Sequence, residues 1–187
     1  MSGELKRELA NLLLEKSYIE GRFTLTSGRT SDYYFDCKPT ALHPKGAYLL
    51  GSLFMDLLQD VDVKGVGGMT LGADPLVSAV TVVSHLRERP LPGFIVRKEA
   101  KGHGTGRYVE GLGNFSEGDR VAMLEDVVTT GGTLIKACER VREAGLEIAA
   151  VLCVLDRDEG GRENLDSAGY RLISIFNRSG LLEAAAS

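Results

Sequence analysis

The segment MLEDVVTTGGTL, residues 123–134, places two carboxylates, Glu125 and Asp126, directly before a turn rich in threonine and glycine. Free backbone N–H groups and the helix dipole at such a turn favour an anion such as phosphate. Gly131 and Gly132 allow a ligand to approach the backbone closely. The carboxylates need other partners, either the hydroxyls of a sugar or a magnesium ion held by oxygen ligands. A ligand that carries a phosphate next to a ribose diol satisfies both halves of the segment.

This turn differs from the phosphate loop of nucleotide-binding enzymes, because it lacks the lysine of the GxxxxGK[ST] pattern. An acidic pair alone is also compatible with a structural role, in which the carboxylates end a strand and are solvated. The attached TTGGT sequence favours the binding site over that interpretation.

A second candidate is the basic segment VRKEAKGHGTGRYVEG, residues 96–111, in which Gly102, Gly104 and Gly106 predict a flexible loop. Such a loop can close over a polyanion and neutralise the charge that develops on a leaving group. An exposed, solvated hairpin is the alternative interpretation. Glu99 is the single negatively charged residue between 97 and 107. The same segment carries four fixed positive charges and a titratable histidine: Arg97, Lys98, Lys101, Arg107 and His103.

Apolar strands alternate with helices along most of the chain, which predicts an α/β fold with a mainly parallel sheet. Ligands of such sheets bind at the carboxyl ends of the strands. A short β-like stretch at 21–36, broken at Ser27-Gly28, precedes this pattern. We expect helices at 4–16, 43–60, 74–85, 132–145 and 162–169, and strands at 63–68, 93–96, 119–125, 147–156 and 170–176.

Two of the expected helices begin at a proline. Asp74 precedes Pro75 and His43 precedes Pro44, so we predict that Asp74 and His43 cap these helices. His85, at the end of a helix, is interpreted as a structural or surface residue. Neither His43 nor His85 has cysteines or carboxylates at metal-ligand spacing.

The composition and charge of the chain limit the classes of function that it can have. A chain of 187 residues with 43% hydrophobic and 26% charged residues is typical of one globular domain. Its net charge of −4 argues against nucleic-acid binding, and its longest apolar run, 148–155, is too short to span a membrane. The N-terminus lacks the apolar core of a signal peptide. Three scattered cysteines predict reduced thiols in a cytoplasmic protein.

The segment 123–134 resembles the phosphoribosyl pyrophosphate (PRPP) motif of the type I phosphoribosyltransferases: a hydrophobic strand, an acidic pair and a hydroxyl- and glycine-rich loop. The resemblance implies that the carboxylates face the ribose hydroxyls and that the loop holds the 5′-phosphate. It also implies the fold of that family, a central, mainly parallel sheet flanked by helices, with a small N-terminal hood and a flexible catalytic loop. The implied PRPP-binding residues here are Glu125, Asp126, Val127, Val128, Thr129, Thr130, Gly131, Gly132 and Thr133.

The loop RKEAKGHGTG resembles the catalytic loop of the orotate phosphoribosyltransferases within that superfamily. In that family the loop reaches into the active site of the neighbouring subunit, so the resemblance implies a homodimer. It implies pyrophosphate contacts from Arg97, Lys98, Lys101 and His103, and it makes Lys101, His103, Glu125 and Asp126 the expected catalytic residues.

Two further segments resemble the part of the family that binds the base. FTLTSGRTSDYYFD, residues 23–36, carries the aromatic pair Tyr34 and Phe35, and VLDRDEGG, residues 154–161, carries Arg157. The resemblance assigns Tyr34, Phe35, Thr129 and Arg157 to orotate, and a guanidinium fork suits a planar, anionic pyrimidine. Singly, the aromatic residues are compatible with ordinary packing and the arginine with a surface ion pair. Their occurrence together with both loops favours the site.

The chain departs from the family pattern at two places. Thr26 stands where many members carry lysine, and GGMTLGADP, residues 67–75, lacks a lysine that some members have. Backbone amides from Thr70 to Gly72 are the proposed replacement for the second cation. These departures bear on affinity more than on the reaction.

The resemblance covers essentially the whole chain, so we expect a single domain, 1–187, in which 1–40 and the C-terminal segment form the hood. The implied reaction transfers ribose 5-phosphate from PRPP to orotate, giving orotidine 5′-monophosphate and pyrophosphate for pyrimidine synthesis. Mg²⁺ is the expected cofactor, held mainly by PRPP, with Glu125 and Asp126 as the candidate protein contacts. The alternatives are transfer to another base and a non-catalytic regulator that senses PRPP; the loop 97–107 counts against both.

Overall fold

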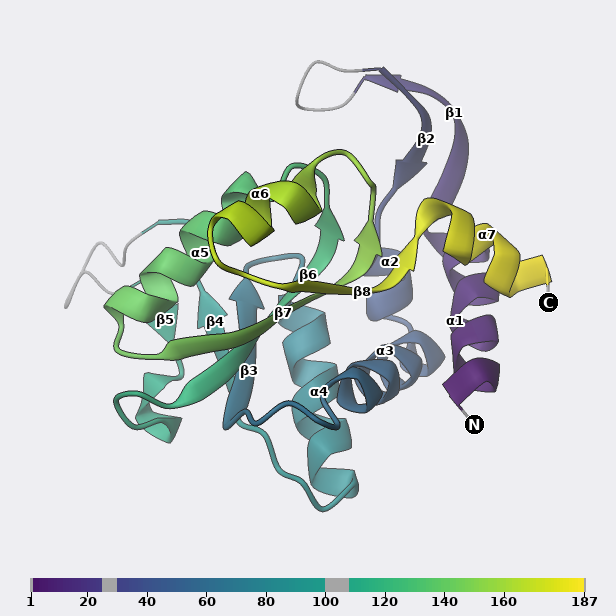
Figure 1. The fold of residues 1–187 in the computed structure, drawn as a ribbon. Coiled ribbons are helices and arrows are strands. Elements are labelled where there is room, and N and C mark those ends of the chain that lie inside the picture. Colours follow the sequence, from purple (N-terminus) through teal and green to yellow (C-terminus); the bar gives the residue numbers. More distant parts are fainter. Residues whose placement is uncertain (1, 25–29, 100–107, 187) are drawn as a thin grey trace.

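The computed structural model describes residues 2–24, 30–99 and 108–186. Its centre is a six-stranded sheet with the order β5-β4-β3-β6-β7-β8 (Figure 1). All neighbouring strands pair in parallel except β5, which runs antiparallel to β4. The strands are β3 (Gly65–Met69), β4 (Gly93–Val96), β5 (Val109–Glu110), β6 (Arg120–Val128), β7 (Glu147–Asp156) and β8 (Leu172–Asn177). The expected mainly parallel α/β sheet is confirmed.

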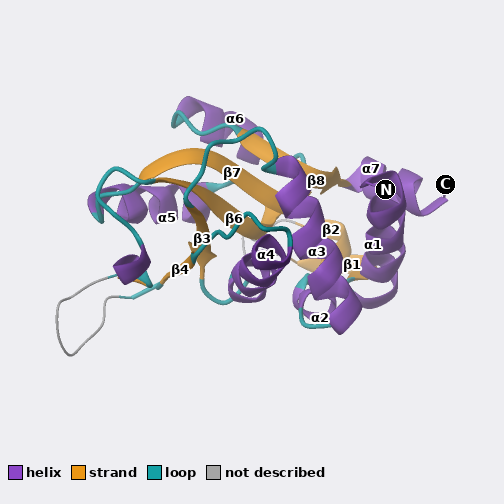
Figure 2. Ribbon diagram, turned by 90° about the horizontal axis from the view of Figure 1, so that it is seen from below, coloured by secondary structure: helices purple, strands orange, loops and turns teal. Residues whose placement is uncertain are grey.

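Helices cover both faces of this sheet (Figure 2). The helices are α1 (Ser2–Lys16), α2 (Lys38–Ala41), α3 (Pro44–Leu57), α4 (Asp74–Leu86), α5 (Gly132–Glu143), α6 (Gly161–Ser167) and α7 (Arg178–Ala186), with a 3₁₀ turn at Leu112–Asn114. The side chains of β6 point alternately into two hydrophobic cores. Ala122 and Leu124 pack with α1, α3 and α4, whereas Val121 and Met123 pack with α5. The period-two pattern of a strand therefore builds a three-layer arrangement.

A separate two-stranded hairpin, β1 (Tyr18–Thr24) and β2 (Thr30–Phe35), extends away from the sheet in Figure 1. The strands are antiparallel, with Tyr18 opposite Phe35 and Thr24 opposite Thr30. Helix α7 follows β8 directly and contacts α1, so the two ends of the chain lie on the same side as the base of the hairpin (Figure 1).

Glycines allow the loop between β3 and α4 to lie close to β6. Every residue of β3 is buried, and a Cβ atom at Gly68 would collide with Ala73 and with the carbonyl oxygen of Leu124. Without that Cβ atom, the start of α4 packs directly against the middle of the sheet. This close packing brings the loop 70–73 to the carboxyl end of β6.

The structure confirms the predicted elements and corrects some of their ends. Strand β7 has the predicted bounds, whereas β6 continues to Val128 and so includes the acidic pair. The prediction that Asp74 caps α4 was wrong: Ala73 is the N-cap, and Oδ2 of Asp74 instead accepts a hydrogen bond of 2.8 Å from Oγ1 of Thr70. His43 holds the N-cap position of α3, but its side chain makes no capping hydrogen bond.

Helix α7 was not predicted. Its sequence, RSGLLEAAA, has a weak amphipathic pattern and buries Leu181 alone among its residues whose side chains are described. Its helical form depends on packing against α1, which lies at the other end of the chain.

Candidate active site

The acidic pair lies at the carboxyl end of β6, between β3 and β7 in the middle of the sheet. The carboxylate of Asp126 packs against the loop that follows β3: a Cβ atom at Gly72 would lie 2.7 Å from Oδ1 and 2.9 Å from Oδ2. Its Oδ1 also accepts a hydrogen bond of 2.9 Å from the N–H of Val127. Two segments far apart in the sequence therefore meet at this carboxylate.

Glu125 is buried, with 9% of its surface exposed. Its Oε1 accepts a hydrogen bond of 3.2 Å from the N–H of Asp126. Burial raises the pKa of Glu125 well above its usual range, and the negative charge of Asp126 raises it further, while Lys98 opposes the shift. A cation or a positively charged sugar carbon next to this pair would offset the repulsion between the two carboxylates.

The turn after the acidic pair leads into α5 through Gly131, whose φ of 78° lies in the left-handed region. Gly131 is the N-cap residue and has no side chain to cap the helix, so the first N–H groups of α5 are available to an anion. Thr130 and Thr133 are exposed beside them. Val128 is buried in the core, so its contribution to a ligand would come from its backbone. This arrangement suits a phosphate group.

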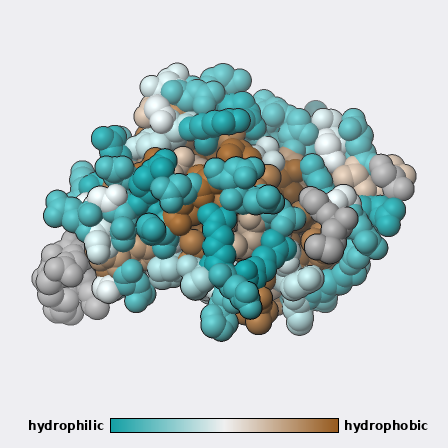
Figure 3. Space-filling view, turned by 60° about the horizontal axis from the view of Figure 1, so that its bottom comes forward, coloured by the Kyte–Doolittle hydropathy of each residue, from teal (hydrophilic) through white to brown (hydrophobic). Residues whose placement is uncertain are grey.

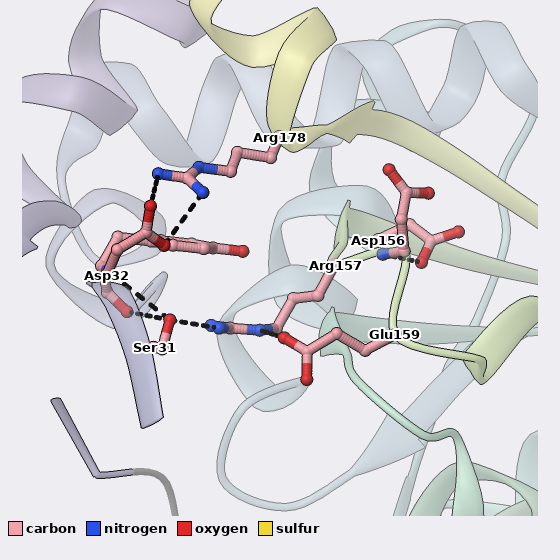
Figure 4. Close-up of polar contacts among 8 residues, drawn as sticks. Ser31, Asp32, Asp156, Arg157, Glu159 and Arg178 are labelled. Carbon is pink, nitrogen blue, oxygen red and sulfur yellow. Dashed lines mark hydrogen bonds and ion pairs between the residues drawn. The ribbon is translucent and has the colours of Figure 1, made fainter. Parts of the chain in front are cut away.

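Arg157 follows β7, so it lies at the carboxyl ends of the strands, as the acidic pair does. Its backbone N–H donates to the carbonyl of Val128 at 2.9 Å. Its guanidinium is held from two sides: Nε donates to Oε1 of Glu159 at 2.8 Å and Nη2 donates to Oγ of Ser31 at 3.0 Å (Figure 4). The guanidinium carbon also lies 4.3 Å from the centre of the Tyr33 ring. The side chain is therefore oriented before any ligand binds.

The aromatic residues of β2 alternate between two environments. Tyr34 is exposed and lies 5.6 Å from the ring of Phe23, whereas Phe35 is buried in the core. Tyr33 is buried as well and stacks on Tyr18 with 5.1 Å between ring centres. Sequence reasoning missed Tyr33 as the aromatic contact of Arg157. The period-two alternation of a strand, which puts Tyr33 and Phe35 on one face, was the available signal.

The basic loop is described only at its two ends. Lys101, His103 and Arg107 lie outside the described residues, as does Thr26. Arg97 pairs with Glu110 at 3.2 Å, and its N–H donates to the carbonyl of Tyr108 at 2.7 Å.

Two further features lie near the acidic pair. The N–H of Thr70 donates to the carbonyl of Val96 at 3.0 Å, which ties the loop after β3 to the end of β4. Nζ of Lys38 lies 2.6 Å from Oδ1 of Asp36, and this contact is the largest cause of the raised pKa of Lys38, to which the charge of Asp126 adds. Sequence reasoning missed Lys38, which brings a cation to the acidic edge.

Across the ranges 2–24, 30–99 and 108–186, no group of three or more histidine, cysteine, aspartate or glutamate side chains is arranged to hold a metal ion. Two carboxylates side by side, Glu125 and Asp126, fit the contact that a ligand-bound Mg²⁺ would need. In the same described ranges, no helix is long and apolar enough to cross a membrane.

Comparisons with known proteins identify the family. Residues 72–177, which include the acidic pair and Arg157, match the family described as phosphoribosyl transferase domain. The chain is 48% identical over 172 residues to the orotate phosphoribosyltransferase of Nostoc sp., covering 92% of this chain and 82% of that one. The chain belongs to the orotate phosphoribosyltransferase family.

Solved structures of this family share the fold. The orotate phosphoribosyltransferase of Mycobacterium tuberculosis, in complex with Fe(III) dicitrate, superposes with a TM-score of 0.83 at 40% identity and covers 95% of this chain and 98% of that one. The same M. tuberculosis enzyme in complex with 5-phospho-α-D-ribosyl 1-diphosphate gives a TM-score of 0.78 at 36% identity over the same shares. The type I phosphoribosyltransferase fold expected from the sequence is therefore confirmed.

Proposed function

We propose that this chain transfers ribose 5-phosphate from PRPP to orotate, giving orotidine 5′-monophosphate and pyrophosphate. The observation that carries the proposal is the convergence at one sheet edge of the acidic pair, the uncapped start of α5 and the pre-oriented Arg157. Membership of the orotate phosphoribosyltransferase family supports the same reaction.

Each half of PRPP matches one half of the segment 123–134. The N–H groups of α5 with Thr129, Thr130 and Thr133 bind the 5′-phosphate, while Glu125 and Asp126 face the ribose hydroxyls. During transfer, the bond from the anomeric carbon to the pyrophosphate oxygen breaks, and a bond to a ring nitrogen of orotate forms. That nitrogen loses its proton, which the departing pyrophosphate takes up. Positive charge develops on the sugar, and the two adjacent carboxylates stabilise it.

Cations neutralise the charge on the departing pyrophosphate. We assign this role to Arg97, Lys98, Lys101 and His103 of the basic segment. Lys98 supports the assignment, because its charge already acts on buried Glu125. The backbone of Gly72 lies against Asp126. Because the N–H of Thr70 already donates to the carbonyl of Val96, the amides of Leu71 and Gly72 are left to complete the pyrophosphate side.

Arg157 binds the orotate carboxylate, with Thr129, Tyr34 and Phe35 forming the rest of the base site. Two nitrogens of Arg157 are occupied by Glu159 and Ser31, so the guanidinium presents a fixed edge to a planar anion. Exposed Tyr34 offers its ring to the base, whereas buried Phe35 supports the strand from behind.

Mg²⁺ is the proposed cofactor. When bound to PRPP, it would neutralise charge on the phosphate oxygens, and Glu125 and Asp126 are the carboxylates that would contact it. The raised pKa of Glu125 supports this assignment, because a cation beside the pair offsets the mutual repulsion.

The active enzyme is proposed to be a homodimer in which the basic loop acts on the partner's site. An apolar groove of about 810 Å³ between α3 and α4 supports this. Figure 3, in which the lower side of Figure 1 comes forward, shows hydrophobic residues at the surface among hydrophilic ones. Leu71 lines the groove next to Gly72, so a second copy seated there would lie beside the acidic pair. The exposed apolar residues that line the groove are Leu42, Tyr48, Leu71, Val82 and Leu86.

Two broader assignments complete the proposal. The enzyme acts in the cytoplasm, without nucleic-acid or membrane partners, which the net charge of −4 supports. The chain is a single domain, 1–187, in which 1–40 and the C-terminal segment form a hood over the base; the contact between α1 and α7 supports this assignment.

A direct assay tests the function. The protein is incubated with Mg²⁺, PRPP and, in turn, orotate, uracil, adenine and hypoxanthine, and loss of orotate is followed by absorbance. Lys101→Ala should lower kcat by about two to three orders of magnitude with the fold intact, and exposed Lys136→Ala on α5 is the matched control. Consumption of another base in place of orotate would select the other acceptor. Binding of PRPP without turnover would select the regulator.

A further inference from the structure

A polar pocket of about 870 Å³ lies between the hairpin and the segments that follow β7 and β8. Its walls carry charges of both signs, including Asp32 of β2, Arg157 and Glu159 after β7, and Arg178 at the start of α7. The hairpin therefore meets the body of the protein mainly through polar side chains at this place (Figure 4).

Arg178 makes a two-pronged contact with the hairpin. Its Nη1 donates to Oδ1 of Asp32 at 2.9 Å and its Nη2 donates to Oδ2 at 2.8 Å, which Figure 4 shows as two dashed lines. The same Nη2 donates to the hydroxyl of Tyr18 at 3.2 Å, so one guanidinium contacts both strands. The Arg178 guanidinium holds the pKa of the Asp32 carboxyl below its usual range. A bidentate fork of this kind fixes orientation as well as distance.

Tyr33 connects this contact to the base site. The guanidinium carbon of Arg178 lies 4.4 Å from the centre of the Tyr33 ring, and that of Arg157 lies 4.3 Å from the same centre. Ser31 joins the arrangement from the other side, because its Oγ accepts from Arg157 at 3.0 Å and donates to the carbonyl of Tyr33 at 2.8 Å. Any movement of β2 would therefore change the position of the Arg157 guanidinium.

We propose that Arg178 is a positioning residue for recognition of the acceptor base. It holds β2 through Asp32 and Tyr33, and β2 in turn fixes the guanidinium of Arg157. The inference rests on the proposed function, in which Arg157 binds the carboxylate of orotate. The ion pair between Arg178 and Asp32 should contribute little to the stability of the fold. The Asp32 side chain is 72% exposed, and ion pairs between exposed side chains add little to the free energy of unfolding. Loss of Arg178 should therefore weaken orotate binding with little effect on unfolding.

The test compares kinetics and stability in four variants of the full chain. In Arg178→Met, the KM for orotate should rise about tenfold, the scale of losing one charge-assisted contact, while the KM for PRPP and the melting temperature stay close to wild type. Arg178→Lys should be intermediate, because an ammonium group cannot form the fork. The matched control is Arg120→Met, which breaks another exposed pair, Arg120 with Asp62 at 3.2 Å, and should change neither KM.

The fourth variant, Asp32→Asn combined with Arg178→Met, tests whether the two residues act as a unit. Its KM for orotate should be no higher than that of Arg178→Met alone. The inference is overturned if Arg178→Met leaves the KM for orotate within twofold of wild type, or raises both KM values equally. The wild-type assay distinguishes failure of this inference from failure of the proposed function. Orotate turnover by wild type together with an unchanged KM in Arg178→Met overturns this inference alone, whereas no orotate turnover by wild type overturns the proposed function and this inference together.

Discussion

The carboxylate of Asp126 and the backbone of Gly72 are in direct contact, so that a single added Cβ atom at Gly72 would lie 2.7 Å from Oδ1. The neighbouring atoms belong to the β3–α4 loop and to the end of β6, and both are held by the packing of the central sheet. A methyl group at this position must move either the loop or the carboxylate that we propose to face the ribose.

Gly72→Ala should therefore lower kcat/KM for PRPP by about fivefold to 150-fold, because overpacking costs about 1–3 kcal/mol and about 1.4 kcal/mol corresponds to tenfold. Steady-state kinetics with varied PRPP measure this effect. Gly113→Ala is the control, because nothing lies within 4 Å of a Cβ atom there. Equal kcat/KM values in the two variants would show that the contact with Asp126 is unimportant.

Burial of Glu125 predicts a pH dependence of stability. Because its pKa is raised in the folded state, the folded protein holds this proton more tightly than the unfolded chain. The free energy of unfolding should therefore fall as pH rises from the usual carboxyl pKa of about 4.3 toward the raised value. Glu125→Gln removes this loss, so its melting temperature should exceed that of wild type at pH 7, and the difference should shrink toward pH 4.

Thermal unfolding across pH 4–8, without PRPP and Mg²⁺, measures this difference. Glu147→Gln, an exposed residue at the start of β7, is the control. Parallel pH profiles for wild type and Glu125→Gln would contradict the prediction. The same substitution should reduce turnover, because it removes a negative charge from the part of the site that we propose to face the sugar.

Arg140 connects α5, the helix that we propose to bind the 5′-phosphate, to the ends of the basic loop. Its Nη1 donates to the carbonyl of Arg97 at 2.7 Å, and its guanidinium carbon lies 4.1 Å from the centre of the Tyr108 ring. Arg140→Met should lower kcat about tenfold, on the scale of one hydrogen bond from a charged donor. The KM for orotate should change little, because Arg157 is untouched.

Single-turnover and steady-state kinetics check this expectation. Arg142→Met, in the same helix and exposed, serves as the control. A drop in kcat that is the same in both variants would point to a general effect of charge on α5 rather than to the contacts of Arg140.

The hydroxyl and the ring of Tyr33 should contribute differently to the free energy of unfolding. Within the described residues, its buried Oη has no hydrogen-bond partner, whereas its ring contacts two guanidinium groups. Tyr33→Phe keeps the ring and removes an unpaired polar atom, so its free energy of unfolding should equal or exceed that of wild type. Tyr33→Leu should lose about 1–3 kcal/mol, mainly because the ring no longer stacks on Tyr18 or contacts buried Arg157. Urea unfolding measures both; a Tyr33→Phe variant as unstable as Tyr33→Leu would refute the distinction.

All three cysteines are buried and free. Burial raises the pKa of each thiol, that of Cys138 to about 12. Because the thiolate is the reactive form, we expect no reaction with Ellman's reagent in the native protein and three equivalents in urea. A rapidly reacting thiol under native conditions would show that one of these sites opens.

Much of the fold could be predicted from the sequence, because strands and helices leave periodic patterns among near neighbours. The ten residues of β7 were predicted with their observed ends, since a buried apolar run bounded by polar residues is a local signal. The acidic pair and the TTGGT turn likewise predicted a phosphate and sugar site from contiguous residues alone.

Contacts between distant segments were decided by the tertiary structure. Asp32 and Arg178 are 146 residues apart, and no local pattern relates them. The cap predicted at Asp74 failed for the same reason, because its carboxylate binds Thr70 in a loop shaped by the packing of β3 against α4. The sequence by itself determined which residues are the candidates for the chemistry of the site. Only the folded chain decided how Gly72, Tyr33 and Arg178 hold those residues in place, because such contacts depend on how the layers pack and not on neighbours along the chain.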